Sequence, residues 1–165
     1  MDAMTQDRSD LVRLRQLVDR MPVAMWTTVE EDGSLASRPM SPLEMDEHGA
    51  LWFFTDRRAT RPQHLRAVNL SFTDPERGTY VSLSGRGQVH TNRDRIGRLW
   101  TVFARPWFPD GPASPHVVLL EFQPSTVEFW EAPQSRMALL IGLAAPAPAV
   151  APHPLVRHEV VSATA

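Results

Sequence analysis

The sequence predicts a mainly β protein, an antiparallel barrel or sandwich of about seven strands with short helices. Short runs of β-branched and aromatic residues recur along the chain, and turn-forming residues separate them. Segments with helical periodicity are few. The chain has 165 residues, close to the size of one domain, so we expect a single core.

The first elements are a helix and a hairpin. Apolar residues at helical spacing from Leu11 to Met21 predict an amphipathic helix. Val23–Val29 and Leu35–Met40 have strand-like composition, and the Asp32–Gly33 dipeptide between them predicts a turn. Two strands therefore pair at the start of the sheet.

The middle of the chain predicts three further strands. Ala50–Thr55 is short, apolar and aromatic, which is typical of a central strand buried on both faces. A short helix is predicted for Pro62–Ala67, because proline suits the first helical turn. Val68–Thr73 and Thr79–His90 are the next strands, and two glycines in the second indicate a bend.

A capped helix and a stiff loop follow. Asn92 is a good N-cap, and proline residues after the helix predict a rigid loop that carries Trp107 and Phe108. The apolar face of this helix comprises Ile96, Leu99, Trp100 and Phe103.

The sheet is expected to close with a second hairpin. Val117–Phe122 and Thr126–Trp130 are its predicted strands, and the turn falls at residues 123–125. Ala144–Pro154 is rich in Ala and Pro and lacks the apolar surface to order itself. We therefore expect one domain over residues 1–143 and a C-terminal tail over residues 144–165.

Charge and composition exclude several classes of function. The formal net charge of -2 gives no global basic field for nucleic acid or an anionic membrane. The absence of cysteine excludes disulfides and thiolate chemistry and fits a reducing compartment. The first ten residues lack the apolar run of a secretory signal, so we expect a cytoplasmic protein. The six histidines show no metal-ligand spacing and are interpreted as surface or turn residues, so no metal is expected.

Known phosphate and hydrolase motifs are also missing. The run from Gly85 to His90 lacks the third glycine of a dinucleotide-binding loop and lies within a predicted strand. Neither a P-loop nor a Gly-x-Ser-x-Gly elbow occurs. The remaining candidates are cationic and aromatic side chains near strand ends.

These candidates suit a flavin nucleotide. Guanidinium groups bind phosphate, apolar side chains sandwich a planar ring, and an unpaired strand edge can bond the polar rim of the ring. The alternative is that Trp52 and Phe54 are core residues and the arginines form a solvated loop. The residues alone leave both open. The candidates are Ser37–Met40, Trp52–Thr55, Arg57, Arg58 and Arg61.

Seven sequence blocks between Leu11 and Trp130 carry a family resemblance. They are Ser37–Met40, Leu51–Thr55, Phe72–Pro75, Tyr80–Gly85, Asp94–Arg95 with Leu99–Trp100, Trp107–Pro109 and Val127–Trp130. In this order they resemble the pyridoxamine 5'-phosphate oxidase-like flavoproteins with an FMN-binding split barrel, specifically the bacterial general stress protein branch.

The resemblance implies a cofactor site. Arg38 would reach the FMN phosphate. Trp107 and Phe108 would cover the isoalloxazine ring across a homodimer interface; the alternative is that they are an ordinary hydrophobic anchor under their loop. The family's phosphate loop contains Ser-x-Lys where this chain has Ala59-Thr60-Arg61, so the serine hydroxyl is missing. The implied cofactor-binding residues are Arg38, Pro39, Met40, Phe53, Phe54, Thr55, Thr60, Arg61 and Trp107.

The resemblance leaves two functions open. One is a homodimeric FMN-binding oxidoreductase with hydride transfer at flavin N5. The other is a stress-response module that binds flavin or a related ligand without turnover. Vitamin B6 oxidation is not expected, because the chain lacks the basic, Trp-containing C-terminal segment of true pyridoxamine 5'-phosphate oxidases. A barrel that binds single-stranded nucleic acid is disfavoured by the net charge.

Overall fold

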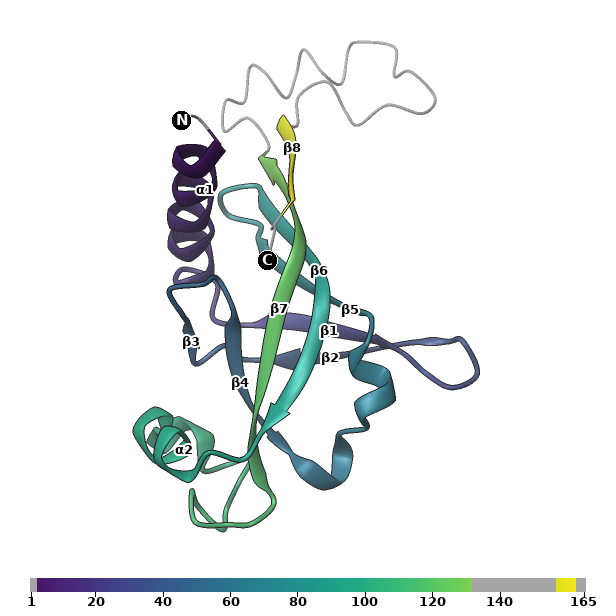
Figure 1. Ribbon diagram of the computed structural model, residues 1–165, viewed down its shortest axis with the longest axis vertical. Coiled ribbons are helices and arrows are strands. Elements are labelled where there is room, and N and C mark those ends of the chain that lie inside the picture. The colour runs from purple at the N-terminus through teal and green to yellow at the C-terminus, as the bar shows by residue number, and fades with distance from the viewer. Residues whose placement is uncertain (1–2, 132–156, 163–165) are drawn as a thin grey trace.

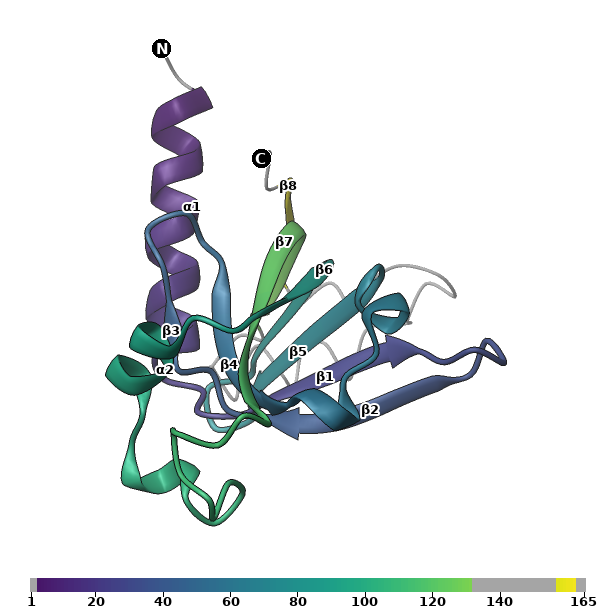
Figure 2. The ribbon, with the colours of Figure 1, turned by 60° about the horizontal axis from the view of Figure 1, so that its bottom comes forward.

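The computed structural model describes residues 3–131 and 157–162. An N-terminal helix and a second, shorter helix accompany a curled antiparallel sheet (Figure 1, Figure 2), and the two helices contribute to two different apolar clusters. The helices are α1 (Ala3–Val18) and α2 (Arg93–Leu99), with short 3-10 turns η1 (Arg57–Ala59), η2 (Pro62–Leu65) and η3 (Val102–Ala104). No helix in the described ranges is long and apolar enough to cross a bilayer.

Eight strands form the sheet, and every pairing in it is antiparallel. The path runs β2-β1-β5-β6-β7-β4-β3, and β8 pairs with β7. The mainly β prediction is therefore confirmed. The strands are β1 (Ala24–Val29), β2 (Leu35–Met40), β3 (Glu44–Met45), β4 (Leu51–Asp56), β5 (Val68–Asp74), β6 (Thr79–His90), β7 (Val117–Glu131) and β8 (Arg157–Ser162).

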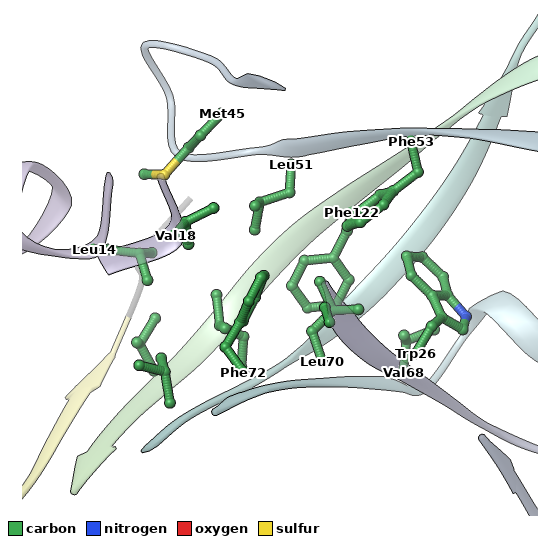
Figure 3. Packing of buried hydrophobic residues seen from close by; sticks show 14 of the residues in the cluster. Leu14, Val18, Trp26, Met45, Leu51, Phe53, Val68, Leu70, Phe72 and Phe122 are labelled. Atoms are coloured by element: carbon green, nitrogen blue, oxygen red, sulfur yellow. The ribbon is translucent and has the colours of Figure 1, made fainter. Parts of the chain in front are cut away.

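The main core fills the concave side of the sheet (Figure 3). Trp26 is its largest fully buried side chain, and its ring makes edge contacts with Phe53 and Phe122 at centroid distances of 5.5 and 5.8 Å. Leu14 and Val18 bring α1 onto the same cluster, as the helical spacing predicted. Alternate residues of β1 point into this core, as expected of a half-buried strand.

A second apolar cluster covers the outside of β4 and β7. Phe54 lies there at centroid distances of 5.4 Å from Trp100 and 6.1 Å from Phe108. Ile96 of α2 is fully buried in the same cluster. Phe53 and Phe54 therefore face opposite cores, which confirms that β4 is buried on both faces. The strand is not central, however, because only the two-residue β3 lies beyond it.

Two further expectations are wrong in detail. The second hairpin does not form, because β7 runs without interruption through residues 123–125. Phe103 lies in η3 and is 84% exposed, because α2 ends at Leu99. Part of the expected tail, Arg157–Ser162, is a strand paired with β7. The boundary placed at residues 143 and 144 lies outside the described residues.

Candidate functional site

An open hollow of about 440 Å³ lies between the β1–β2 hairpin and the segment that follows β4. It combines two guanidinium groups with three carboxylates, so its lining carries a net charge of -1 with His64 neutral. Its lining residues are Glu30, Glu31, Asp32, Ser34, Arg38, Ala59, Arg61 and His64.

The topology of the sheet brings Arg38 and Arg61 to this hollow. Arg38 lies on β2, which is one end of the sheet path, and β4 lies next to the other end. Both views place the C-terminal end of β2 close to β4 (Figure 1, Figure 2). The chain leaving β4 passes through η1 to Arg61, the residue before η2. Two arginines distant in sequence therefore line one hollow.

Asp56 organises the turn between β4 and Arg61. Its carboxylate accepts a hydrogen bond from the backbone N–H of Arg58 at 2.8 Å and pairs with that arginine's guanidinium at 2.6 Å. These hydrogen bonds and the nearby positive charge lower the pKa of Asp56 to about 2. The Thr60 hydroxyl donates to the Asp56 carbonyl at 3.0 Å and lies 3.0 Å from the Thr55 hydroxyl. Thr55 and Thr60 thus serve the turn.

The tip of the β1–β2 hairpin supplies the acidic wall. Asp32 accepts hydrogen bonds from the backbone N–H of Ser34 at 2.9 Å and from its hydroxyl at 2.6 Å. These bonds lower the pKa of Asp32, so the carboxyl stays charged at neutral pH. Gly33 has φ of 82°, a left-handed conformation that suits glycine in this turn. The predicted hairpin turn is confirmed.

Each arginine in the hollow faces a glutamate of that tip. Arg38 Nη2 lies 3.9 Å from Glu30 Oε1, and Arg61 Nη1 lies 3.2 Å from Glu31 Oε1. Glu30 Oε2 is also 3.3 Å from His64 Nδ1. The acidic tip therefore neutralises much of the positive charge that the two arginines bring.

His64 differs from its interpretation as a surface or turn residue. Its side chain is only 12% exposed, because η2 packs against β1 and β6. Its Nε2 is buried and has no hydrogen-bond partner among the described residues. A buried imidazole nitrogen without a partner is uncommon, whereas the other ring nitrogen, Nδ1, faces Glu30 of the hollow.

The other predicted cofactor residues do not line the hollow. Phe53 and Phe54 have their side chains in the two cores, so only the backbone of β4 is left there to meet a ligand. Pro39 is exposed, Met40 packs against the main core, and Trp107 is 79% exposed on its loop. Their assignment to a cofactor remains a prediction.

Sequence reasoning missed five residues of the hollow: Glu30, Glu31, Asp32, Ser34 and His64. The run of three acids at a hairpin turn was visible in the sequence. The pairing of these acidic residues with arginines on β2 and after β4 depends on how the sheet curls. Local sequence patterns do not predict that curl. Among residues 3–131 and 157–162, no three His, Asp or Glu side chains gather as metal ligands.

The arrangement is suited to binding a phosphate. Guanidinium groups bind phosphate oxygens through charged hydrogen bonds, and two arginines line this hollow. The volume falls within the range of roughly 300–1,000 Å³ typical of ligand pockets. Any anion must compete with the glutamates.

Comparison with curated proteins gives one fungal relative. The chain is 26% identical to the protein bli-3 of Neurospora crassa over 117 residues, which cover 64% of this chain. The matched part covers 56% of the length of that protein, so this chain corresponds to little more than half of it.

Solved structures share the fold. A Clostridium acetobutylicum protein related to general stress protein 26 is 22% identical, with a TM-score of 0.64, and the match covers 75% of this chain and 89% of that one. The general stress FMN/FAD binding protein of Xanthomonas citri is 25% identical, with a TM-score of 0.61, over 78% of this chain and 90% of that one. The general stress protein 26 of Bacillus anthracis is 17% identical, with a TM-score of 0.63, over 72% and 92%.

These likenesses confirm the split-barrel prediction. A family model described as pyridoxamine 5'-phosphate oxidase like matches residues 9–148, which is most of the chain. The match includes the β1–β2 hairpin and the turn after β4 that form the hollow. The chain therefore belongs to the pyridoxamine 5'-phosphate oxidase-like family.

Proposed function

We propose that this chain is an FMN-binding flavoprotein that holds the phosphate of the cofactor with Arg38 and Arg61. The observation that carries the proposal is that these two arginines, from β2 and from the turn after β4, line the same hollow. The Xanthomonas citri relative described above as an FMN/FAD binding protein supports the ligand class.

The residues present fit the phosphate end of FMN. Arg38 is held by strand pairing, with Trp26 as its partner in register, so its guanidinium starts from a fixed backbone. Arg61 precedes η2, and its side chain is 63% exposed and paired with Glu31, so it would turn toward a ligand when that exposed pair opens. Ala59 lines the hollow without a donor, and the Thr60 hydroxyl already donates to Asp56. Neither residue offers a free hydroxyl to the phosphate, so phosphate binding by Arg38 and Arg61 depends on their charge.

The bound isoalloxazine ring would supply hydride or electron transfer at N5. The chain's part is to position it: the arginines fix the phosphate, and the β4 backbone is left to meet the polar rim. Both faces of β4 are packed, so its backbone is rigid. Pre-organised contacts of this kind lower the entropic cost of binding.

The proposal includes a symmetric homodimer. Val102, Phe103 and Trp107 are 74%, 84% and 79% exposed on one loop, which is unusual for large apolar side chains. A second copy would cover them and would bring Trp107 toward a site that its own chain does not place it in. Light scattering that shows a monomer at micromolar concentration would contradict this part.

A binding module without turnover is the second candidate. The glutamates that face both arginines and the missing donor at Ala59 favour it, since both weaken the hold on phosphate. Flavin that is bound but not reduced by any nicotinamide or thiol donor would support this candidate over an oxidoreductase.

A titration tests the site. The purified protein is titrated with FMN and with riboflavin, and the flavin absorbance and fluorescence are followed. Arg38→Ala should weaken FMN binding about tenfold to a hundredfold, because a charged hydrogen bond is worth roughly 1.5–3 kcal/mol, and should leave riboflavin binding unchanged. Arg98→Ala, on the exposed side of α2, is the matched control. Equal loss of both ligands would show that Arg38 is not the phosphate ligand.

A further inference from the structure

The Glu31 carboxylate lies where a phosphate oxygen would find two donors. Its Oε1 accepts a hydrogen bond from Arg61 Nη1 at 3.2 Å and a second from Gln63 Nε2 at 3.2 Å. One oxygen that receives a guanidinium N–H and an amide N–H is bound much as a phosphate oxygen is. The wall of the hollow thus contains an internal substitute for the ligand.

The contact between Glu31 and Arg61 can be replaced by a contact with a ligand at little cost in stability. The side chains of Glu31 and Arg61 are 67% and 63% exposed, and exposed pairs of this kind contribute little stability. Glu31 can turn into solvent without leaving a buried charge behind. Its departure would free both donors at once and would bring the net charge of the lining from -1 to zero.

Glu30 behaves differently from Glu31. Its carboxylate accepts a hydrogen bond from the Thr28 hydroxyl at 3.2 Å and faces His64 at 3.3 Å, and its side chain is 31% exposed. It lies 3.9 Å from Arg38, the longer of the two arginine contacts. Glu30 therefore stays in place and leaves Arg38 partly available, whereas Arg61 is released only when Glu31 moves.

We infer that Gln63 is a phosphate-binding residue and that Glu31 is its internal competitor, displaced when the FMN phosphate enters. This inference rests on the proposed function and adds two residues to it. Gln63 takes over as the neutral donor that Ala59 lacks, because its amide N–H already converges with Arg61 on one oxygen. Glu31 lowers the affinity for the phosphate and not for the ring.

The two residues should act in opposite directions. Glu31→Gln removes the competing charge and should tighten FMN binding about two- to fivefold, the range expected for release of an exposed ion pair. Gln63→Ala removes a donor and should weaken FMN binding by about tenfold or less, because the donor is lost to Glu31 as well as to the phosphate. Riboflavin binding should be unchanged in both.

Matched controls are Glu47→Gln, on the exposed β3–β4 turn, and Gln88→Ala, an exposed position on β6. Gln63 is itself not a lining residue and is connected to the hollow through its hydrogen bond to Glu31, whereas no such bond joins Glu47 or Gln88 to Glu31 or Arg61 among the described residues. Unchanged or weaker FMN binding by Glu31→Gln would overturn the inference, as would unchanged binding by Gln63→Ala. An equal change for riboflavin would overturn it too, because the effect would then not act on the phosphate.

If the unmodified protein binds neither flavin, the proposed function fails, and the inference is tested with inorganic phosphate alone. Thermal unfolding is measured with and without phosphate at constant ionic strength. The upward shift of Tm caused by phosphate should be larger for Glu31→Gln and smaller for Gln63→Ala than for the unmodified protein. Equal shifts in all three would overturn the inference.

Discussion

Gly85 of β6 lies directly opposite Pro124 of β7, at the point where the register between these two strands shifts. A proline has no N–H for the ladder, so a strand interior normally rejects it. The other edge of β7 has no paired strand at this point, because its pairing with β4 ends at Phe122 and its pairing with β8 begins at Thr126. The strand can therefore run through the proline without losing a needed hydrogen bond.

Replacement of Gly85 should destabilise the fold. A Cβ at this position would lie 2.1 Å from the Gln123 carbonyl oxygen, which is backbone and cannot turn away. We expect Gly85→Ala to lower the free energy of unfolding by roughly 1–3 kcal/mol, the usual cost of overpacking, as measured by urea denaturation.

Gly97→Ala is the matched control. Gly97 lies in α2, and a Cβ there meets nothing within 4 Å. Alanine in a helix interior should stabilise by about 0.5–1 kcal/mol. The two substitutions should change the free energy of unfolding in opposite directions. An unchanged free energy of unfolding for Gly85→Ala would mean that the β-bulge at this register shift relaxes to accept the methyl group.

The same bulge explains one failure of sequence reasoning. The sequence around Pro124 predicts a turn, because local composition cannot show that the pairing of β7 with the strands on both of its edges changes at that point. By contrast, the β1–β2 hairpin and the Asn92 cap were predictable, since each depends on residues within a few positions. The Asn92 side chain does accept a hydrogen bond from the Arg95 backbone N–H at 2.9 Å.

The candidate site was predictable only in part. The two arginines stood out because cations near strand ends suit phosphate, and both line the hollow. The competing acids did not, because the pairing of Arg61 with Glu31 bridges segments that the curl of the sheet brings together. The double burial of β4 was predictable from its apolar run, but the cause is α2 and its loop rather than a central place in the sheet.

Arg93 should hold the loop that carries Trp107. Its guanidinium donates to the carbonyl oxygens of Ser114 at 2.9 Å and Val117 at 3.0 Å. Arg93→Ala removes both of these hydrogen bonds and leaves Ser114 O with only the backbone N–H of Val117 at 3.3 Å, so we expect a loss of about 1–3 kcal/mol in the free energy of unfolding.

Hydrogen exchange checks where that loss is felt. Faster exchange of the Ser114 and Val117 amides is expected in Arg93→Ala, because both lie in the turns that Arg93 holds. Arg98→Ala, on the exposed face of the same helix, should change stability by less than about 0.5 kcal/mol. Similar exchange rates of these amides in Arg93→Ala and Arg98→Ala would show that Arg93 does not hold the loop in place.

Asp56 gives the fold a pH dependence in the acid range. Its pKa is lowered to about 2 in the folded chain, against about 3.9 in an unfolded one. The carboxylate therefore stabilises the fold above about pH 4, and the contribution is lost as the pH falls toward 2. Asp56→Asn should cost up to about 1 kcal/mol at pH 7, since the ion pair with Arg58 is largely exposed.

The measurement is urea denaturation of both proteins between pH 7 and pH 3. The difference between them should be constant from pH 7 to about pH 5 and should shrink below pH 4. Asp19→Asn, an exposed position after α1, is the control for a general charge effect. A difference that stays constant down to pH 3 would show that the carboxylate is not the source.

Ala59→Ser restores the hydroxyl that the family's phosphate loop carries, and the structure gives a reason to expect a gain. Ala59 lines the hollow, is exposed, and is the last residue of η1, the turn that Asp56 caps, so a serine there needs no rearrangement of the core. One added hydrogen bond is worth about 0.5–1.5 kcal/mol, so FMN should bind roughly two- to tenfold more tightly, with riboflavin unchanged.

Ala113→Ser, in the exposed loop outside the hollow, controls for the added hydroxyl itself. Tighter binding of riboflavin as well would move the effect from the phosphate to the ring, and unchanged FMN binding would mean that the phosphate does not reach this side of the hollow.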